Sequence, residues 1–163
     1  MDYERDTLNA YRTPERAAEY KAFHTGGFTW GRLVTALEQR WIHRELTRHE
    51  WSAADRLLDI PCGTGILGKL TRRFPFEIMV SDISNEMLAL AREEYPADRL
   101  AGCLRADITD TGLPRESFSC VVTLGFFHRV PIEIKRAALR EISDLSSRLV
   151  ILSCSVDTPF QRL

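Results

Sequence analysis

Short apolar runs alternate with amphipathic stretches along the chain from Arg56 onward. This alternation is typical of parallel strands joined by helices that cover both faces of a sheet. We therefore predict an α/β fold, a Rossmann-like doubly wound parallel sheet that ends after its fifth strand and is preceded by N-terminal helices. The strands are predicted at Arg56–Ile60, Phe76–Ser81, Leu100–Ala106, Phe118–Leu124 and Leu149–Val156.

Apolar residues spaced by three and four positions predict the helices between these strands. Ser84 is expected to cap the helix after the second strand, which Pro96 ends, and Pro131 to begin the helix after the fourth. The expected buried sides are Ile66, Leu67, Leu70 and Phe74 in the first helix, Leu88, Ala91 and Tyr95 in the second, and Ile134, Ala138, Ile142 and Leu145 in the last.

The first 50 residues are predicted to be helical, with a break at Gly26–Gly27. A helical segment ahead of an α/β core commonly acts as a lid across the ligand crevice. We therefore divide the single domain into an N-terminal helical lid, residues 1–50, and an α/β core, residues 51–163. The second helix of the lid is expected to bury one apolar face made of Leu33, Leu37, Trp41, Ile42 and Leu46.

The stretch Asp59-Ile60-Pro61-Cys62-Gly63-Thr64-Gly65 joins the first strand to the next helix. Glycines at 63 and 65 would let a ligand approach the backbone closely. Amide groups at the start of the helix can bind a carboxylate, and Asp59 can accept a hydrogen bond from an ammonium group. A ligand with an amino acid head would satisfy both.

Two further acidic residues follow the next two strands. Asp82 ends the second strand, where a carboxylate can bind both hydroxyls of a ribose. Asp107 ends the third strand, where it could accept from an adenine amino group while Ile108 packs on the ring. Each residue alone also suits a tight turn or a helix cap. Their order at successive strand ends favours a nucleoside site at the carboxyl edge of the sheet.

These residues together resemble the class I S-adenosylmethionine-dependent methyltransferases, particularly the small-molecule group with an Asp-x-x-Cys-Gly-Thr-Gly first motif. The stretch 81–88, Ser-Asp-Ile-Ser-Asn-Glu-Met-Leu, is similar to the second motif of that family, and Ala106-Asp107-Ile108 to its third. Residues 113–122 resemble the approach to its fourth strand. Pro61 departs from the family, since many relatives have a glycine there, and Ser119 replaces a common Asp.

The resemblance implies that S-adenosylmethionine is the cofactor. By the same resemblance, Tyr20 would cover this methyl donor, Asp59 and Gly63 would contact its methionine part, and Asp82 its ribose. The other residues implied at the cofactor are Pro61, Cys62 and Gly65 in the turn, Ile83 and Met87 at the nucleoside, Asp107 and Ile108 at the adenine, and Leu124 and Gly125 near the sulfonium.

The expected reaction is methyl transfer to a small-molecule acceptor by direct in-line displacement, and positioning can supply about 7–11 kcal/mol of its barrier lowering. His128 is the nearest candidate for a catalytic base, and Trp30, Phe126 and Phe127 could wall the site. One alternative is an inactive module that binds the donor and serves a partner. Another is an NAD-dependent dehydrogenase, because Gly63-x-Gly65-x-x-Gly68 matches GxGxxG, although no Tyr-x-x-x-Lys pair occurs.

Charge and composition narrow the class of protein. The chain has 22 Lys and Arg against 23 Asp and Glu, so neither nucleic acid nor a membrane is an expected partner. No apolar run could span a bilayer, and acidic residues interrupt the N-terminus where a signal peptide would need an apolar core. The four cysteines form no CxxC pair or metal-ligand pattern. We expect them to be free, mostly buried thiols in a cytoplasmic protein without a metal.

The fifth strand would leave an exposed sheet edge. The family's sheet normally continues with a helix and an antiparallel pair, whereas this sequence stops at Leu163. Natural proteins seldom leave such an edge bare. The alternatives are a piece of a longer chain, a homo-oligomer or partner chain that covers the edge, and a degenerate domain.

Overall fold

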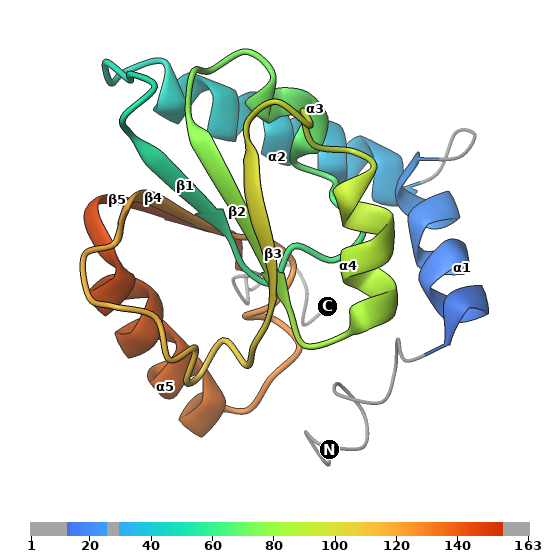
Figure 1. The fold of residues 1–163 in the computed structure, drawn as a ribbon. Helices are drawn as coiled ribbons and strands as arrows, with labels where there is room; N and C mark the ends of the chain where they lie inside the picture. The colour runs from blue at the N-terminus through green and yellow to red at the C-terminus, as the bar shows by residue number, and fades with distance from the viewer. Residues whose placement is uncertain (1–12, 26–29, 155–163) are drawn as a thin grey trace, which may run out of the picture.

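The computed structural model describes residues 13–25 and 30–154, without the side chains of five of them, Tyr20 and Trp30 among these. Five helices and five strands follow one another as the ribbon in Figure 1 shows. They are α1 (Pro14–Thr25), α2 (Trp30–Leu46), β1 (Arg56–Asp59), α3 (Gly68–Thr71), β2 (Glu77–Asp82), α4 (Asn85–Arg92), β3 (Leu100–Arg105), β4 (Phe118–Thr123), α5 (Ile132–Leu145) and β5 (Ser146–Leu152).

All five strands belong to one parallel sheet in the order β3-β2-β1-β4-β5. The chain builds outward from β1 to β3, crosses back through residues 106–117, and continues on the other side of β1 with β4. The strand order therefore reverses between β1 and β4, and open parallel sheets bind ligands outside the carboxyl ends of the strands at such a point. The predicted Rossmann-like sheet is confirmed.

Neighbouring residues of β1 pack on opposite faces of the sheet, because side chains alternate along a strand. Leu57 belongs to a core shared with Ile42, Leu46 and residues of α4, whereas Leu58 belongs to a core shared with residues of α5. The helices α2, α3 and α4 accordingly cover one face and α5 the other (Figure 1). Both faces of the central strands β1 and β4 are covered, so these strands need apolar residues at nearly every position.

The helix predicted after β1 is much shorter than expected. Residues 61–67 form consecutive turns, and only Gly68–Thr71 is helical. Gly63 and Gly65 have φ angles of 52° and 80°, outside the range of a right-handed helix, which delays its start. The predicted apolar residues Leu67, Leu70 and Phe74 are nevertheless buried.

The predicted apolar face of α2 is wrong in its first half. Leu33, Leu37 and Trp41 are 42%, 50% and 55% exposed, whereas Ile42 and Leu46 are buried as expected. The side of α2 that faces the sheet also carries the small or polar residues Gly31 and Thr35. An apolar stripe therefore remains on the outer side of this helix, and spacing alone assigned it to the core.

Two other predictions need correction. The fifth strand begins at Ser146, directly after the last residue of α5, instead of at Leu149. Two of the four free cysteines, Cys103 and Cys154, are exposed. Cys103 lies on β3, an edge strand whose alternate residues are exposed.

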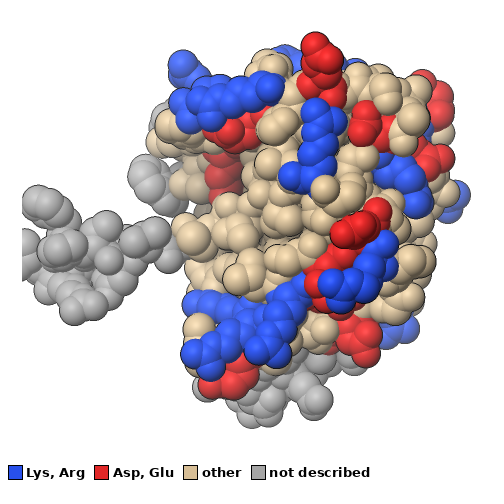
Figure 2. Space-filling view, turned by 90° about the vertical axis from the view of Figure 1, so that its left-hand side faces the viewer, with Lys and Arg blue, Asp and Glu red and all other residues tan. Residues whose placement is uncertain are grey.

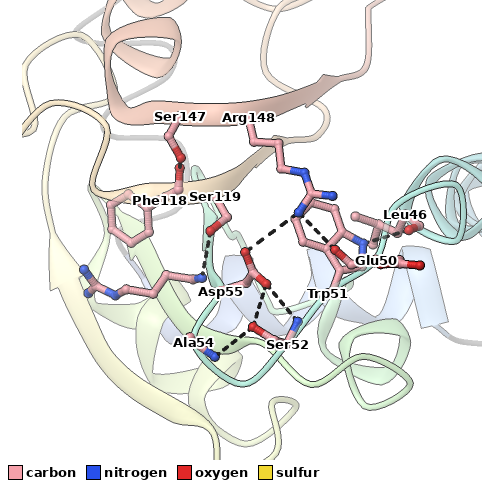
Figure 3. Close-up of polar contacts among 11 residues, drawn as sticks. Leu46, Glu50, Trp51, Ser52, Ala54, Asp55, Phe118, Ser119, Ser147 and Arg148 are labelled. Atoms are coloured by element: carbon pink, nitrogen blue, oxygen red, sulfur yellow. Dashed lines mark hydrogen bonds and ion pairs between the residues drawn. The ribbon is translucent and has the colours of Figure 1, made fainter.

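A polar cluster closes the amino edge of the sheet, opposite the carboxyl ends of the strands (Figure 3). Arg148 of β5 donates to the carbonyl oxygen of Glu50 at 3.0 Å, and its guanidinium lies 4.5 Å from the centre of the Trp51 ring. Asp55 accepts from the backbone and the hydroxyl of Ser52 at 2.8 and 2.9 Å. These contacts tie the segment between α2 and β1 to the far edge strand.

Basic and acidic side chains are interspersed on the face shown in Figure 2, in agreement with the balanced composition. Within the described ranges, no helix has the length and apolar character needed to cross a membrane. No group of three or more His, Cys, Asp or Glu in these ranges could hold a metal ion.

The packing of α3 against the segment after α4 predicts that alanine destabilises the protein at Gly68 but not at Gly102. A Cβ atom on Gly68 would lie 2.6 Å from the carbonyl oxygen of Glu94, so Gly68→Ala should lower the free energy of unfolding by about 1–3 kcal/mol. Gly102→Ala is the control, because its Cβ would meet only the end of Met79 at 3.8 Å. Urea denaturation of both variants tests this, and equal stabilities would contradict it.

Candidate functional site

The turn after β1 is held open by backbone contacts with β2. The amide of Cys62 donates to the carbonyl oxygen of Ser81 at 2.8 Å, and the amide of Gly63 donates to Oδ2 of Asp82 at 2.9 Å. Gly63 has a left-handed φ of 52°, which favours glycine over residues with a Cβ. The turn therefore curves back over the end of β2 and leaves its backbone at the carboxyl edge of the sheet.

Gly65 also allows the turn to pack closely against α4. A Cβ atom on it would lie 2.8 Å from the Cα atom of Ala91 in α4, so the absence of a side chain here permits helix packing. Gly63 lines the neighbouring pocket, whereas Gly65 does not. The two glycines of the motif thus act on opposite sides of the turn.

A pocket of about 230 Å³ opens where the strand order reverses. Phe23, Val34 and Glu38, from α1 and α2, contribute to its lining although the sequence did not mark them. The helices of the predicted lid therefore border the pocket. The predicted residues that line it are Asp59, Pro61, Cys62, Gly63, Leu124, Gly125 and His128.

Asp59 is the buried acidic group of this pocket, which Glu38 also lines, and it is 2% exposed. The pKa of its carboxyl is raised to about 7, chiefly by burial and to a smaller extent by the nearby Asp82 charge, while a hydrogen bond from Tyr95 opposes the shift. The hydroxyl of Tyr95 donates to Oδ2 of Asp59. Sequence reasoning placed Tyr95 in the core but missed this contact. The available signal was that a buried tyrosine hydroxyl needs a partner.

Asp82 is also buried, and both of its carboxylate oxygens already accept backbone hydrogen bonds. Oδ2 accepts from Gly63 and Oδ1 from Ser84, each at 2.9 Å. Burial raises the pKa of Asp82, and these amide donors reduce the increase. The Ile83 backbone also hydrogen-bonds this carboxylate, so only part of its capacity of about four acceptor positions remains for a ligand hydroxyl. The side chain of Ser84 also caps α4 by accepting from the amide of Met87 at 3.2 Å, as predicted.

The predicted adenine-side residues lie close to strand ends but outside the pocket. Oδ1 of Asp107 accepts from the amide and hydroxyl of Thr109, both at 2.8 Å, so Asp107 also organises its own turn. Ile108 and Met87 are buried, at 4% and 3% exposure. Ile83 lines a second cavity of about 170 Å³ next to the start of α4. The predicted site residues therefore do not all line one cavity.

His128 lies at the pocket rim on the loop between β4 and α5. Its Nε2 accepts from Nε of Arg129 at 3.2 Å. Partial burial lowers the pKa of His128, and the charges of Arg129 and Lys135 lower it further, so the neutral imidazole is favoured. Phe126 and Phe127, predicted as possible walls, are buried in the core beside α5. The side chains of Tyr20 and Trp30 fall outside the described part of the chain.

Buried hydroxyls add unpaired polar groups near the carboxyl edge. The hydroxyl oxygens of Thr64, Ser81 and Thr123 have no hydrogen-bond partner among the described residues. They lie in the turn after β1, near the end of β2 and at the end of β4. Buried polar groups are usually satisfied in a complete assembly. None of these three residues lines the pocket, so their hydroxyls lie behind its wall.

Comparison with solved structures places the fold. Magnesium protoporphyrin IX methyltransferase from Synechocystis PCC 6803 with bound SAM is similar, at 16% identity and a TM-score of 0.75 over 96% of this chain and 77% of that one. A SAM-dependent methyltransferase from Archaeoglobus fulgidus has 20% identity and a TM-score of 0.56, over 78% of this chain and 53% of that one. A search of the curated proteins finds no match.

A family model matches the part of the chain that forms the sheet side of the pocket. The family model described as "Methyltransferase domain" matches residues 57–147, more than half of the chain and every strand end that borders the pocket. This match favours methyl transfer over the dehydrogenase alternative. The chain belongs to this methyltransferase domain family and is a class I S-adenosylmethionine-dependent methyltransferase.

Proposed function

We propose that this chain binds S-adenosylmethionine in the Asp59 pocket and transfers the methyl group to a small-molecule acceptor that enters beside His128. The observation that carries the proposal is the pocket itself, where the Asp59 carboxylate, the Gly63 backbone and the end of β4 meet. The amino acid head of the donor carries an ammonium group, which needs acceptors. The Asp59 carboxylate can supply one and the backbone carbonyl of Gly63 another, since the Gly63 amide already donates to Asp82. Burying a carboxylate is costly unless it is paired, so an ammonium group bound at Asp59 would stabilise this buried charge.

The residues present fit such a donor. Gly63 has no Cβ to fill the space beside Asp59, and the pocket extends along Leu124 and Gly125. We assign Asp59 and Gly63 to the methionine part of the donor, and Asp82 to the ribose through its remaining lone pairs. Further proposed donor contacts are Tyr20, Ile83, Met87, Asp107 and Ile108.

S-adenosylmethionine supplies an electrophilic methyl group on a positively charged sulfur. The chain's own contribution is to hold the donor in one orientation, exclude water and admit the acceptor in line with that methyl group. The neutral imidazole of His128 could take a proton from an acceptor that is protonated in solution, once Arg129 releases its Nε2 atom. Glu38 and Arg129 border the same pocket and offer charged contacts to the acceptor.

Calorimetry with S-adenosylmethionine and, separately, with NAD tests the proposal, followed by transfer of a labelled methyl group to a panel of small molecules. Binding of the sulfonium nucleoside together with transfer supports it. Donor binding without transfer to any acceptor would instead support an inactive module that serves a partner. NAD binding with none for the sulfonium nucleoside would overturn the assignment.

Donor affinity should depend on pH through Asp59. Its pKa is about 7, and only the ionised carboxylate pairs with an ammonium, so affinity should fall as pH decreases from 7.5 to 6. In this range the donor's amino group stays mostly charged, since its usual pKa is about 8. Asp59→Asn should weaken donor binding at pH 7.5 by at least about tenfold, the effect of a charge interaction that is equivalent to one pKa unit. It should also remove the pH dependence of the affinity.

Asp55→Asn is the matched control for that measurement. Asp55 precedes β1 at the opposite edge of the sheet, where it bonds Ser52, so the same change should leave donor affinity and its pH dependence unaltered. If Asp59→Asn binds the donor as the unchanged chain does, the ammonium lies elsewhere.

A catalytic role for His128 predicts a rate effect without a binding effect. For an acceptor with a protonated nucleophile, His128→Gln should lower kcat by about 10²- to 10⁴-fold and leave the donor Kd unchanged. Wild-type kcat should rise with pH through the lowered pKa of this histidine, below 6.5. A decrease in kcat of less than about threefold, with the pH profile intact, would assign His128 to acceptor shaping instead.

A further inference from the structure

Tyr95 reaches Asp59 from the protein core. It follows the end of α4, its residue is 3% exposed, and its hydroxyl donates to Oδ2 of Asp59. Asp59 lines the pocket, whereas Tyr95 does not. Among the described residues, Tyr95 is the hydrogen-bond donor to the Asp59 carboxylate. One carboxylate oxygen is therefore held by the protein while the residue still faces the pocket.

The position of Tyr95 follows from the packing of the motif turn. Gly65 lies against Ala91 of α4, and Gly68 lies against Glu94, the residue just before Tyr95. Larger residues at either glycine would push the end of α4 away. The close approach thus brings the phenol ring beneath the end of β1, where Asp59 is the last residue.

We propose that the buried hydroxyl of Tyr95 positions the Asp59 carboxylate, in its charged form, for the ammonium group of the bound donor. This inference rests on the proposed function, since it concerns the donor's amino group. A charged carboxylate accepts a stronger hydrogen bond than a neutral one, so the hydroxyl favours ionisation. The hydrogen bond also fixes the rotation of the carboxylate group, which would be unrestrained without a partner. Tyr95 acts through Asp59 and is a positioning residue.

The groups around Asp59 other than Tyr95 do not stabilise its charged form. Asp82 opposes ionisation of Asp59 by its negative charge, and the Cys62 thiol is kept neutral because burial raises its pKa. Burial and the Asp59 charge likewise raise the pKa of Tyr95, so its hydroxyl keeps the proton that it donates. The remaining ionisable or charged groups that face this region are Glu38 from α2, Cys103 from β3, and His128 and Arg129 from the loop after β4.

The test compares donor affinity in Tyr95→Phe and in the unchanged chain across pH 6 to 8.5. The ratio of the two Kd values removes the titration of the donor's own amino group, which is common to both. We expect a ratio of roughly tenfold at pH 6 that falls toward one at pH 8.5, since a raised pKa of Asp59 matters only where the carboxyl is partly protonated. A ratio that stays constant with pH would mean that the ring is merely structural, and would overturn the inference.

Thr71→Val is the control for the loss of a buried hydroxyl. The Thr71 hydroxyl donates to the carbonyl oxygen of Gly68 at 2.7 Å, and it makes no recorded contact with Asp59. Its Kd ratio should not vary with pH. If the Kd ratio of Thr71→Val rises at low pH as much as that of Tyr95→Phe, the assignment to Tyr95 is contradicted.

A second readout separates this inference from the proposed function. The pKa of Asp59 in the ligand-free protein, measured by NMR on carboxyl-labelled aspartate, should rise in Tyr95→Phe and remain unchanged in Thr71→Val. If the unchanged chain does not bind S-adenosylmethionine at any pH, the proposed function fails while this measurement still decides the coupling. An unchanged Asp59 pKa in Tyr95→Phe would overturn the coupling even if the donor binds.

Discussion

The close contact between the motif turn and α4 is the constraint on which the rest of the pocket depends. Gly65 and Gly68 allow the backbone of the turn to approach Ala91 and Glu94 at distances that leave no room for a Cβ atom. This contact sets where α4 ends and how the turn curves over β2. Together with the hydrogen bonds of Cys62 and Gly63 to the end of β2, it sets the position of the turn beside the pocket and of Tyr95 beneath Asp59.

The buried Asp59 carboxyl illustrates how such a site balances stability against binding. An unpaired buried charge is costly, and the raised pKa of about 7 expresses that cost. A buried phenol offsets part of it without closing the pocket. A ligand ammonium would offset the remainder, so the group that destabilises the ligand-free site is also the group that would select its ligand.

The proposed donor side and the proposed acceptor side of the pocket are built in different ways. The donor side is assembled from strand ends and a turn, whose positions are set by the hydrogen bonds of one parallel sheet. The acceptor side combines α2 with the loop between β4 and α5, which share few such constraints. Glu38, His128 and Arg129 come from these elements. Residues that choose an acceptor can therefore vary while the sheet edge stays the same.

The sequence by itself determined the class of the fold and the place of the site. Strand order along the chain, the glycines after β1 and the acidic residues at successive strand ends are local patterns, and parallel strands necessarily bring their carboxyl ends to one edge. Asp59 and Gly63 were predicted for this reason, and Leu124 and Gly125 from the family resemblance. All four line one pocket.

Only the tertiary structure decided which faces are buried and which side chains pair. Leu33, Leu37 and Trp41 have the spacing of a core face, yet the sheet packs against the side of α2 that carries Gly31 and Thr35. Tyr95 and Asp59 are 36 residues apart, so no local pattern could reveal their hydrogen bond. Burial and pairing depend on how elements meet in space, and that information is absent from the periodicity of any single element.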